Sequence, residues 1–150
     1  MSRWQAETTV FGPPFRACGT IEYRRRQCAR PILIAEDNAL LALDLSHALE
    51  TAGFEVIGPA LSVEQALALI ESPGCDAAVL DINLGKETSE LVALELKDRG
   101  TPFVTLSGYA PEQHPAAFHG APALAKPLRP EVLVAEVRWC MEQEAHRPAI

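Results

Sequence analysis

Polar residues that could act together on a phosphoryl group follow apolar runs at four separate places in the chain. These polar signals are Glu36-Asp37, Asp81, Ser107 and Lys126. If the apolar runs are neighbouring parallel strands, their carboxyl ends lie at one edge of the sheet. Three carboxylates, a hydroxyl and an ammonium group would then share one pocket. Such a set suits a divalent cation and a phosphoryl group.

The three carboxylates of Glu36, Asp37 and Asp81 predict a bound cation. Two carboxylates about 4 Å apart repel each other by about 4 kcal/mol at an effective dielectric constant of about 20. A cation between them relieves this repulsion. Hard oxygen ligands select magnesium, manganese or calcium over zinc, and Mg²⁺ keeps several waters and takes further ligands from phosphate. A shallow site of this kind therefore favours Mg²⁺.

Asp81 is the candidate nucleophile, because a carboxylate at the end of a strand can attack phosphorus and hold an acyl phosphate. Ser107 could donate a hydrogen bond to one phosphoryl oxygen, and Lys126 could place a positive charge at another. Removal of the phosphoryl group needs an in-line water. Asn83 and Tyr109 are placed in the sequence to assist or block that water.

Each of these residues also has an ordinary structural interpretation. Glu36 or Asp37 could begin a helix, where acidic residues are favoured. Asp81 could cap a turn, Ser107 could start a loop, and Lys126 could be surface charge. The combination favours the functional interpretation, because four strand ends carry groups that complement one another.

The elements that must position these residues alternate regularly between strand and helix. Expected strands are 31–36, 54–59, 76–82, 102–107 and 121–125. Expected helices start after Asn38 and after Ser62, cover 87–99 and 111–119, and start again at Pro130. Short connections and right-handed crossovers predict an α/β fold with a doubly wound, five-stranded parallel sheet. Ligands of such sheets bind beyond the carboxyl ends of the strands.

Composition and charge limit the other possibilities. The 150 residues suggest one domain, the hydrophobic fraction of 48% supports a real core, and the formal net charge of −7 argues against a nucleic-acid-binding domain. Residues 1–30 hold six arginines and two glutamates, and we expect an irregular basic leader there, a domain over 31–146 and a tail at 147–150. The sequence shows no membrane span, and the four cysteines, which lack zinc spacing, favour a reduced, cytoplasmic protein.

In this order and spacing, Glu36-Asp37, Asp81, Ser107 and Lys126-Pro127 resemble a CheY-like receiver domain of two-component signalling. The resemblance covers residues 31–146. It implies a sheet of order 2-1-3-4-5 with helices on both faces. It also implies a cis bond between Lys126 and Pro127.

The resemblance further implies that Asp81 accepts a phosphoryl group from a histidine kinase or a phosphotransfer protein. By the same analogy, Asp37, Asp81 and the backbone carbonyl of Asn83 hold Mg²⁺, and Glu36 acts through water. Lys126 and Ser107 would bind the phosphoryl oxygens. Such a protein is not an enzyme, beyond catalysing its own phosphorylation and dephosphorylation. As a single-domain response regulator without a DNA-binding domain, it would signal to an unknown target by protein contact, or act as a phosphate sink.

Three positions depart from the usual receiver pattern. The switch position three residues before Lys126 is Ala123 instead of an aromatic residue, and the usual Pro and Gly after the acceptor are replaced by Gly85 and Ser89. The segment 102–109 resembles the "FAT GUY" group of receivers, common in alphaproteobacteria, which are often stand-alone and work with HWE-type or related kinases. Our hypothesis is that Tyr109 takes over signalling or shields the phosphoryl group.

The helix expected at 111–119, the fifth strand and the last helix would form the contact face for a partner. This face would contain Tyr109, Phe118 and two histidines, His114 and His119, that we expect to be solvated.

Three rival functions stay open from the sequence. A phosphatase of the haloacid-dehalogenase type would need a second Asp two residues after the nucleophile, where this chain has Asn83, and its nucleophile lies on the first strand. A receiver-like interaction module that is never phosphorylated would usually have lost part of the pocket. A flavodoxin relative would need a Ser/Thr-rich phosphate loop, whereas Glu36-Asp37 would repel phosphate.

Overall fold

A computed structural model describes residues 30–146, which form an α/β fold around a five-stranded parallel sheet. The sheet consists of β1 (Pro31–Ala35), β2 (Glu55–Ala60), β3 (Ala77–Asp81), β6 (Phe103–Ser107) and β7 (Ala123–Ala125). Their order is β2-β1-β3-β6-β7, so the predicted order 2-1-3-4-5 is confirmed. The expected basic leader, apart from Arg30, and the expected tail lie outside the described residues.

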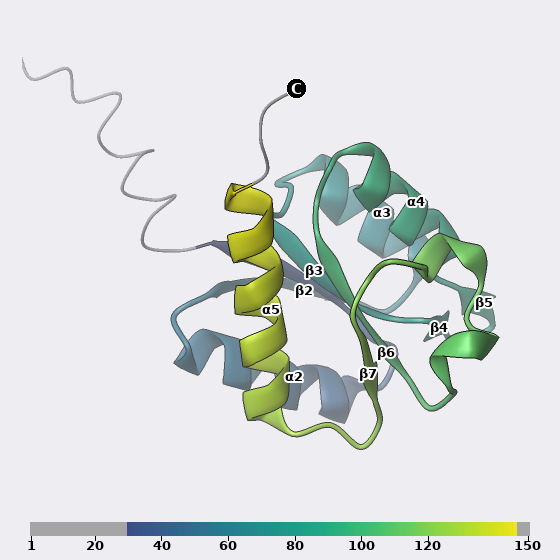
Figure 1. Cartoon of the computed structure of the whole chain (residues 1–150), viewed down its shortest axis with the longest axis horizontal. Helices are drawn as coiled ribbons and strands as arrows, with labels where there is room; N and C mark the ends of the chain where they lie inside the picture. The colour runs from purple at the N-terminus through teal and green to yellow at the C-terminus, as the bar shows by residue number, and fades with distance from the viewer. Residues whose placement is uncertain (1–29, 147–150) are drawn as a thin grey trace, which may run out of the picture.

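Two pairs of helices cover the two faces of the sheet (Figure 1). One pair is α2 (Ala39–Thr51) and α5 (Pro130–Ala145), and the other is α3 (Val63–Glu71) and α4 (Glu90–Asp98). The central strands β1, β3 and β6 are almost wholly buried, as expected of parallel strands that are covered on both sides. A separate hydrophobic cluster lies against each face, so the core has two halves with the sheet between them.

Helix starts follow from the capping residues. The side chain of Asn38 accepts hydrogen bonds from the backbone N–H groups of Leu40 and Leu41, which starts α2. Ser62 caps α3 by accepting from the N–H of Gln65 at 3.2 Å. The Gln65 side chain reaches back to the N–H of Leu61 at 2.9 Å, one residue earlier than in a standard capping box.

The prediction of a helix at 111–119 was wrong. Two short 3₁₀ turns, η1 (Pro111–Gln113) and η2 (Ala116–Phe118), stand in its place. Pro115 lacks an N–H donor and disfavours a helical conformation at the preceding residue. His114 is accordingly extended, with φ −76° and ψ 140°. The described part of the chain therefore has four α-helices around its five-stranded sheet.

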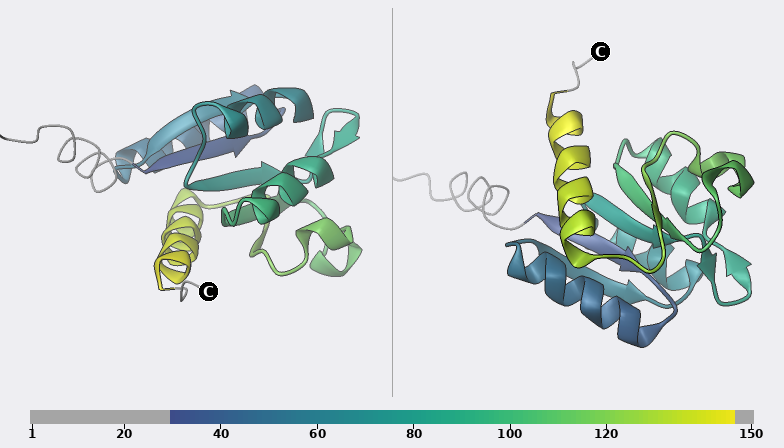
Figure 2. Two further views of the ribbon diagram at one scale, coloured as in Figure 1. Left: turned by 90° about the horizontal axis from the view of Figure 1, so that it is seen from above. Right: turned by 60° about the horizontal axis from the view of Figure 1, so that its bottom comes forward.

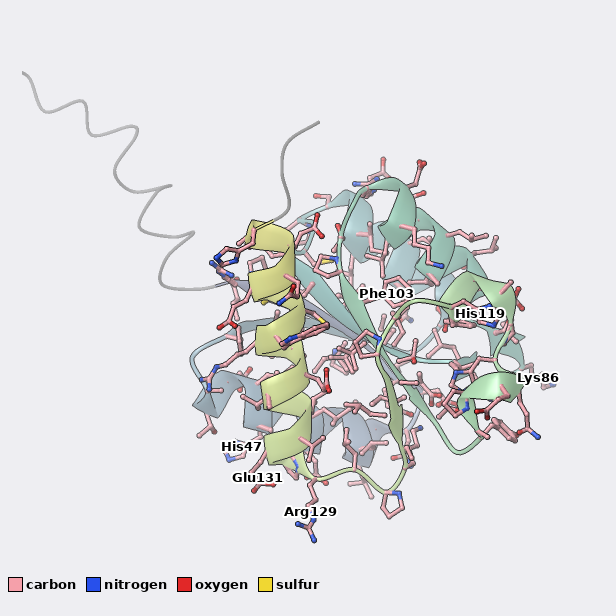
Figure 3. All side chains as sticks on the ribbon, viewed as in Figure 1. His47, Lys86, Phe103, His119, Arg129 and Glu131 are labelled. Carbon is pink, nitrogen blue, oxygen red and sulfur yellow. The ribbon has the colours of Figure 1, made fainter. Side chains whose placement is uncertain are left out.

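A small hairpin between β3 and α4 was not predicted from the sequence. Its strands β4 (Asn83–Leu84) and β5 (Glu87–Thr88) pair in antiparallel fashion, beyond the carboxyl end of β3. Figure 2 shows the hairpin projecting from the edge of the sheet. Lys86, at its tip, points away from the molecule (Figure 3). The hairpin shortens the expected 87–99 helix to nine residues.

Gly58 sets the path of the edge strand β2 beside β1. Its φ is +100°, and a Cβ at this position would lie 2.7 Å from the backbone nitrogen of Ala60 and 2.9 Å from the carbonyl oxygen of Ile34. Only glycine tolerates this combination without strain. The register between β1 and β2 shifts at this point, and the N–H of Glu36 bonds the carbonyl of Ala60 at 3.1 Å. The bend in β2 thus supports the backbone at the first acidic residue.

Candidate functional site

Glu36 is a fully buried carboxylate at the end of β1, with a relative exposure of 0%. Its Oε1 accepts a hydrogen bond from the backbone N–H of Asn38 at 3.0 Å, and its Oε2 accepts one from Lys126 Nζ at 3.0 Å. Desolvation by burial raises the pKa of Glu36, an effect that the two hydrogen bonds only partly offset. Glu36 is therefore easier to protonate than an exposed glutamate.

Asp81 is the last residue of β3, at the centre of the sheet, and is 6% exposed. Its Oδ1 accepts from the backbone N–H of Asn83 at 3.2 Å, and its Oδ2 accepts from Lys126 Nζ at 2.8 Å. Asp81 is the first polar residue of β3, which is buried along its whole length. One side of this carboxylate is thus held by the backbone and the other by a cation.

Lys126 bridges the two buried carboxylates from the loop after β7. Its ammonium group lies 3.0 Å from Glu36 Oε2 and 2.8 Å from Asp81 Oδ2. Burial lowers the pKa of Lys126, but the hydrogen bonds to Asp81 and Glu36 outweigh this effect and the pKa is raised overall. The bond between Lys126 and Pro127 is cis, as the family resemblance implied. Lys126 thus joins the carboxyl ends of β1 and β3.

Asp37 completes a cluster of three carboxylates, although its own side chain is exposed. One oxygen each of Glu36, Asp37 and Asp81 can be chosen so that all lie within 4.8 Å of one another. Asp37 Oδ2 accepts a hydrogen bond from the backbone N–H of Gly85, in the β4–β5 hairpin, at 2.9 Å. All the side-chain atoms that the cluster offers as metal ligands are hard carboxylate oxygens, and the Asp37 side chain faces solvent. This donor set fits a hydrated Mg²⁺ ion.

Ser107 ends β6, the strand next to β3, and is 3% exposed. Its Oγ accepts a hydrogen bond from the backbone N–H of Tyr109 at 2.9 Å. Because Ser107 Oγ is the acceptor in that bond, its own proton is left to be donated elsewhere. The sheet order therefore brings a hydroxyl donor beside the carboxylate cluster.

Tyr109 and Asn83 differ from the other candidates because both side chains are exposed. The ring of Tyr109 is 59% exposed, at the start of the segment that contains η1 and η2. Tyr109 is connected to the pocket through its backbone N–H, which donates to Ser107 Oγ. Asn83 meets Asp81 through its backbone N–H.

The contact face expected from the sequence needs correction. Phe118 and His114 are buried, at 2% and 8% exposure, and Phe118 belongs to the hydrophobic cluster under α3 and α4. The ring Nε2 of His114 lies 3.3 Å from the carbonyl oxygen of Tyr109, and that of His119 lies 3.1 Å from the carbonyl oxygen of His114. These rings thus hold the backbone of the segment together. His119 is visible at its surface (Figure 3).

Sequence reasoning missed how two residues of the hairpin region contact the cluster. Gly85 and Ser89 were noted only as departures from the usual receiver pattern. In the structure, Gly85 bonds Asp37 and the hydroxyl of Ser89 bonds the carbonyl of Asp81 at 2.6 Å. The glycine within the polar run after Leu84 was the one available signal, since such a glycine often marks a hairpin turn.

Comparison with known proteins identifies the class of this fold, although no protein-family model matches the sequence. A response regulator receiver protein from Sinorhizobium medicae is 29% identical, covering 77% of this chain and 97% of its own, with a TM-score of 0.68. A CheY-like receiver domain from Methanospirillum hungatei gives a TM-score of 0.71 at 24% identity, covering 78% of this chain and 97% of its own.

Among curated proteins, the transcriptional regulatory protein PdtaR of Mycobacterium tuberculosis is 29% identical over 102 residues, or 67% of this chain. The chain matches about half the length of that relative, 50%. The fold and the strand-end site together define a receiver domain of the CheY-like, response-regulator class. The resemblance inferred from the sequence is thereby confirmed at the level of this class. Assignment to the FAT GUY group stays a prediction.

In the part of the chain that the structure describes, no helix combines the length and the apolar character needed to cross a membrane. The two cysteines within this part, Cys75 and Cys140, are free thiols. Burial raises the pKa of each to about 11, so both are protonated at neutral pH.

Proposed function

We propose that this chain is a phosphoacceptor signalling protein in which Asp81 carries the phosphoryl group. The observation that supports this most is the environment of Asp81. A buried carboxylate at the end of the central strand is held by Lys126 and lies beside two other carboxylates. Buried acidic clusters are costly unless a cation compensates them, so the cluster is better explained by chemistry than by stability.

In the proposed reaction, a carboxylate oxygen of Asp81 attacks the phosphorus of a phosphohistidine on a donor protein. The new P–O bond forms as the P–N bond breaks, and the departing imidazole takes up a proton. The product on this chain is an acyl phosphate. The proposed donor is a sensor histidine kinase, of the HWE type or a related one, or a phosphotransfer protein.

Asp37, Asp81 and the backbone carbonyl of Asn83 would hold Mg²⁺, with Glu36 acting through water. When bound, the ion supplies positive charge that offsets the charge of the transferring group. Lys126 contacts the same carboxylate that would be phosphorylated, so it is positioned to follow the new phosphoryl oxygens. Ser107 would donate its hydroxyl proton to another of these oxygens.

Loss of the phosphoryl group would occur by attack of water on phosphorus, which regenerates the Asp81 carboxylate and releases inorganic phosphate. Asn83 and Tyr109 are exposed and lie two positions after Asp81 and Ser107, and we propose that they modulate this step. The protein would then act in the cytoplasm, by contact with a target protein or as a phosphate sink. The free thiols of Cys75 and Cys140 are consistent with that compartment.

The first prediction concerns labelling with acetyl phosphate and Mg²⁺, followed by intact-protein mass spectrometry. We expect a gain of one phosphoryl group in the unmodified chain and none in Asp81→Asn. The matched control is Asp76→Asn, which changes an exposed aspartate outside the carboxylate cluster. It should label like the unmodified chain.

Two other results would contradict the proposal in different ways. An unmodified chain that binds Mg²⁺ but takes up no phosphoryl group would favour the non-phosphorylated interaction module. Repeated turnover of a generic phosphate ester would favour the phosphatase. Asn83 opposes the latter, because an amide is a poor proton donor to a leaving group.

A further inference from the structure

The hydroxyl of Ser89 is turned away from the helix that it begins. Ser89 occupies the N-cap of α4 but makes no side-chain capping hydrogen bond. A serine at this position normally accepts a hydrogen bond from an N–H group in the first turn of the helix. Here Ser89 Oγ instead donates to the backbone carbonyl of Asp81 at 2.6 Å. The residue is fully buried, at 0% exposure.

Ser89 closes the base of the loop that follows the acceptor strand. Its backbone N–H donates to the carbonyl of Ile82 at 2.8 Å, and its Oγ lies 3.3 Å from the same carbonyl oxygen. The β4–β5 hairpin, in which Asn83 pairs with Thr88, lies between these bonds. One buried side chain therefore ties the start of this loop to its end.

The tip of the same loop reaches the carboxylate cluster. The N–H of Gly85 donates to Asp37 Oδ2 at 2.9 Å, and the N–H of Asn83 donates to Asp81 Oδ1 at 3.2 Å. Gly85 has a φ of +66°, which favours glycine. The loop thus orients two of the three carboxylates with backbone donors, while Ser89 fixes its base.

We propose that Ser89 is a positioning residue for the cation site, acting through the carbonyl of Asp81 and the closed 82–89 loop. This inference rests on the proposed function, since it assigns Ser89 a task at the same Mg²⁺ site. Side chains that orient metal ligands from behind typically change metal affinity by about 10- to 100-fold when removed. A serine that only capped α4 would change stability and leave the Mg²⁺ affinity unaffected.

The test is a Mg²⁺ titration of the unphosphorylated, full-length chain, followed by ¹H–¹⁵N NMR at the Gly85 and Asn83 amides. We expect Ser89→Ala to raise the Kd for Mg²⁺ by about tenfold. Ser89→Cys is close to serine in size but has only a weak S–H donor, so its Kd should be intermediate. This second variant keeps the test decisive if Ser89→Ala does not fold.

Ser62→Ala is the matched control, because Ser62 is also a serine N-cap and its hydroxyl bonds the Gln65 N–H of its own helix. It should lose stability but keep the Kd of the unmodified chain. The inference is overturned if both Ser89 variants bind Mg²⁺ as tightly as the unmodified chain, if Ser62→Ala weakens binding equally, or if the unmodified chain binds no Mg²⁺. Normal Mg²⁺ binding without any labelling by acetyl phosphate would overturn only the proposed phosphoacceptor function.

Discussion

At the scale of single residues, Lys126 controls the charge balance of the pocket. It is the cation in both of the ion pairs that the structure describes at Glu36 and Asp81, and its side chain is 28% exposed. The pKa of Lys126 is raised above 10.5, so these ion pairs persist until the pH passes that value. The pKa of Glu36 is also raised, above 4.5, because burial disfavours its ionised form. For this carboxylate the shift means that the charged form is costly at neutral pH.

This balance predicts a pH-dependent effect of Lys126→Met in Mg²⁺-free buffer. At pH 7.5 we expect a loss of about 2 kcal/mol in the free energy of unfolding, because Glu36 and Asp81 are left without their cation. The contribution of Glu36 is most favourable below 4.5 and declines as the pH rises through its folded-state pKa. The loss should therefore shrink as the pH falls toward 4, because a growing fraction of Glu36 is protonated.

Urea unfolding at both pH values measures this difference. Lys97→Met is the control, because Lys97 is an exposed lysine whose ammonium group bonds only a backbone carbonyl, that of His119, among the bonds described. It should show a small loss that does not depend on pH. An equal loss for Lys126→Met at both pH values would refute this account of the pocket.

At the scale of elements, the segment from Tyr109 to Phe118 connects the pocket to the surface. Its first residue donates to Ser107 Oγ, and the rings of His114 and of the adjoining His119 lie within hydrogen-bonding distance of backbone carbonyls of the segment. The buried Phe118 anchors its far end to the core. Because the usual aromatic switch position holds Ala123, this segment is our candidate for responding to phosphorylation.

For this segment we predict that Tyr109→Ala shortens the lifetime of the phosphorylated state. If the ring shields the phosphoryl group from water, its removal should lower the activation free energy of hydrolysis by about 0.7 kcal/mol, which speeds hydrolysis about threefold. Tyr109→Phe, which keeps the ring, should stay close to the unmodified chain. Trp139→Ala is the control, since Trp139 is an exposed aromatic residue on α5 with a similar exposure of 54%. Unchanged phosphorylation lifetime and unchanged kinase binding in Tyr109→Ala would end the hypothesis.

At the scale of the whole molecule, the site joins strand ends that are far apart in the sequence. Its residues come from the ends of β1, β3 and β6 and from the loop after β7, and the sheet separates two hydrophobic clusters. A ligand held by these strand ends binds the folded state and has no preformed site in the unfolded chain. Mg²⁺ should therefore stabilise the entire fold.

The expected stabilisation is about 2.7 kcal/mol when free Mg²⁺ is present at about a hundred times its Kd. Urea unfolding with and without Mg²⁺ measures it. Asp37→Asn should lose most of the effect, because it removes one carboxylate of the cluster. Asp44→Asn, which changes an exposed aspartate on α2 outside the cluster, should keep the effect. Equal stabilisation of both variants would mean that Mg²⁺ acts elsewhere.

The sequence by itself determined five strands with Glu36, Asp37, Asp81, Ser107 and Lys126 at or just after their ends. The strand order 2-1-3-4-5 came from the family resemblance. The physical reason is that buried parallel strands are continuous apolar runs, and their ends are marked where polar residues begin. Receiver-domain class follows from the same pattern, and the structural comparisons confirm it.

Only the tertiary structure decided how the connections between these strands are built. The 111–119 segment is too short and too interrupted by proline for its periodicity to decide between an α-helix and two 3₁₀ turns. The bonds from Gly85 to Asp37 and from Ser89 to Asp81 depend on how the hairpin folds back, which involves residues 48 and 8 positions apart. A local sequence pattern does not predict such contacts, because their geometry depends on how the neighbouring elements pack.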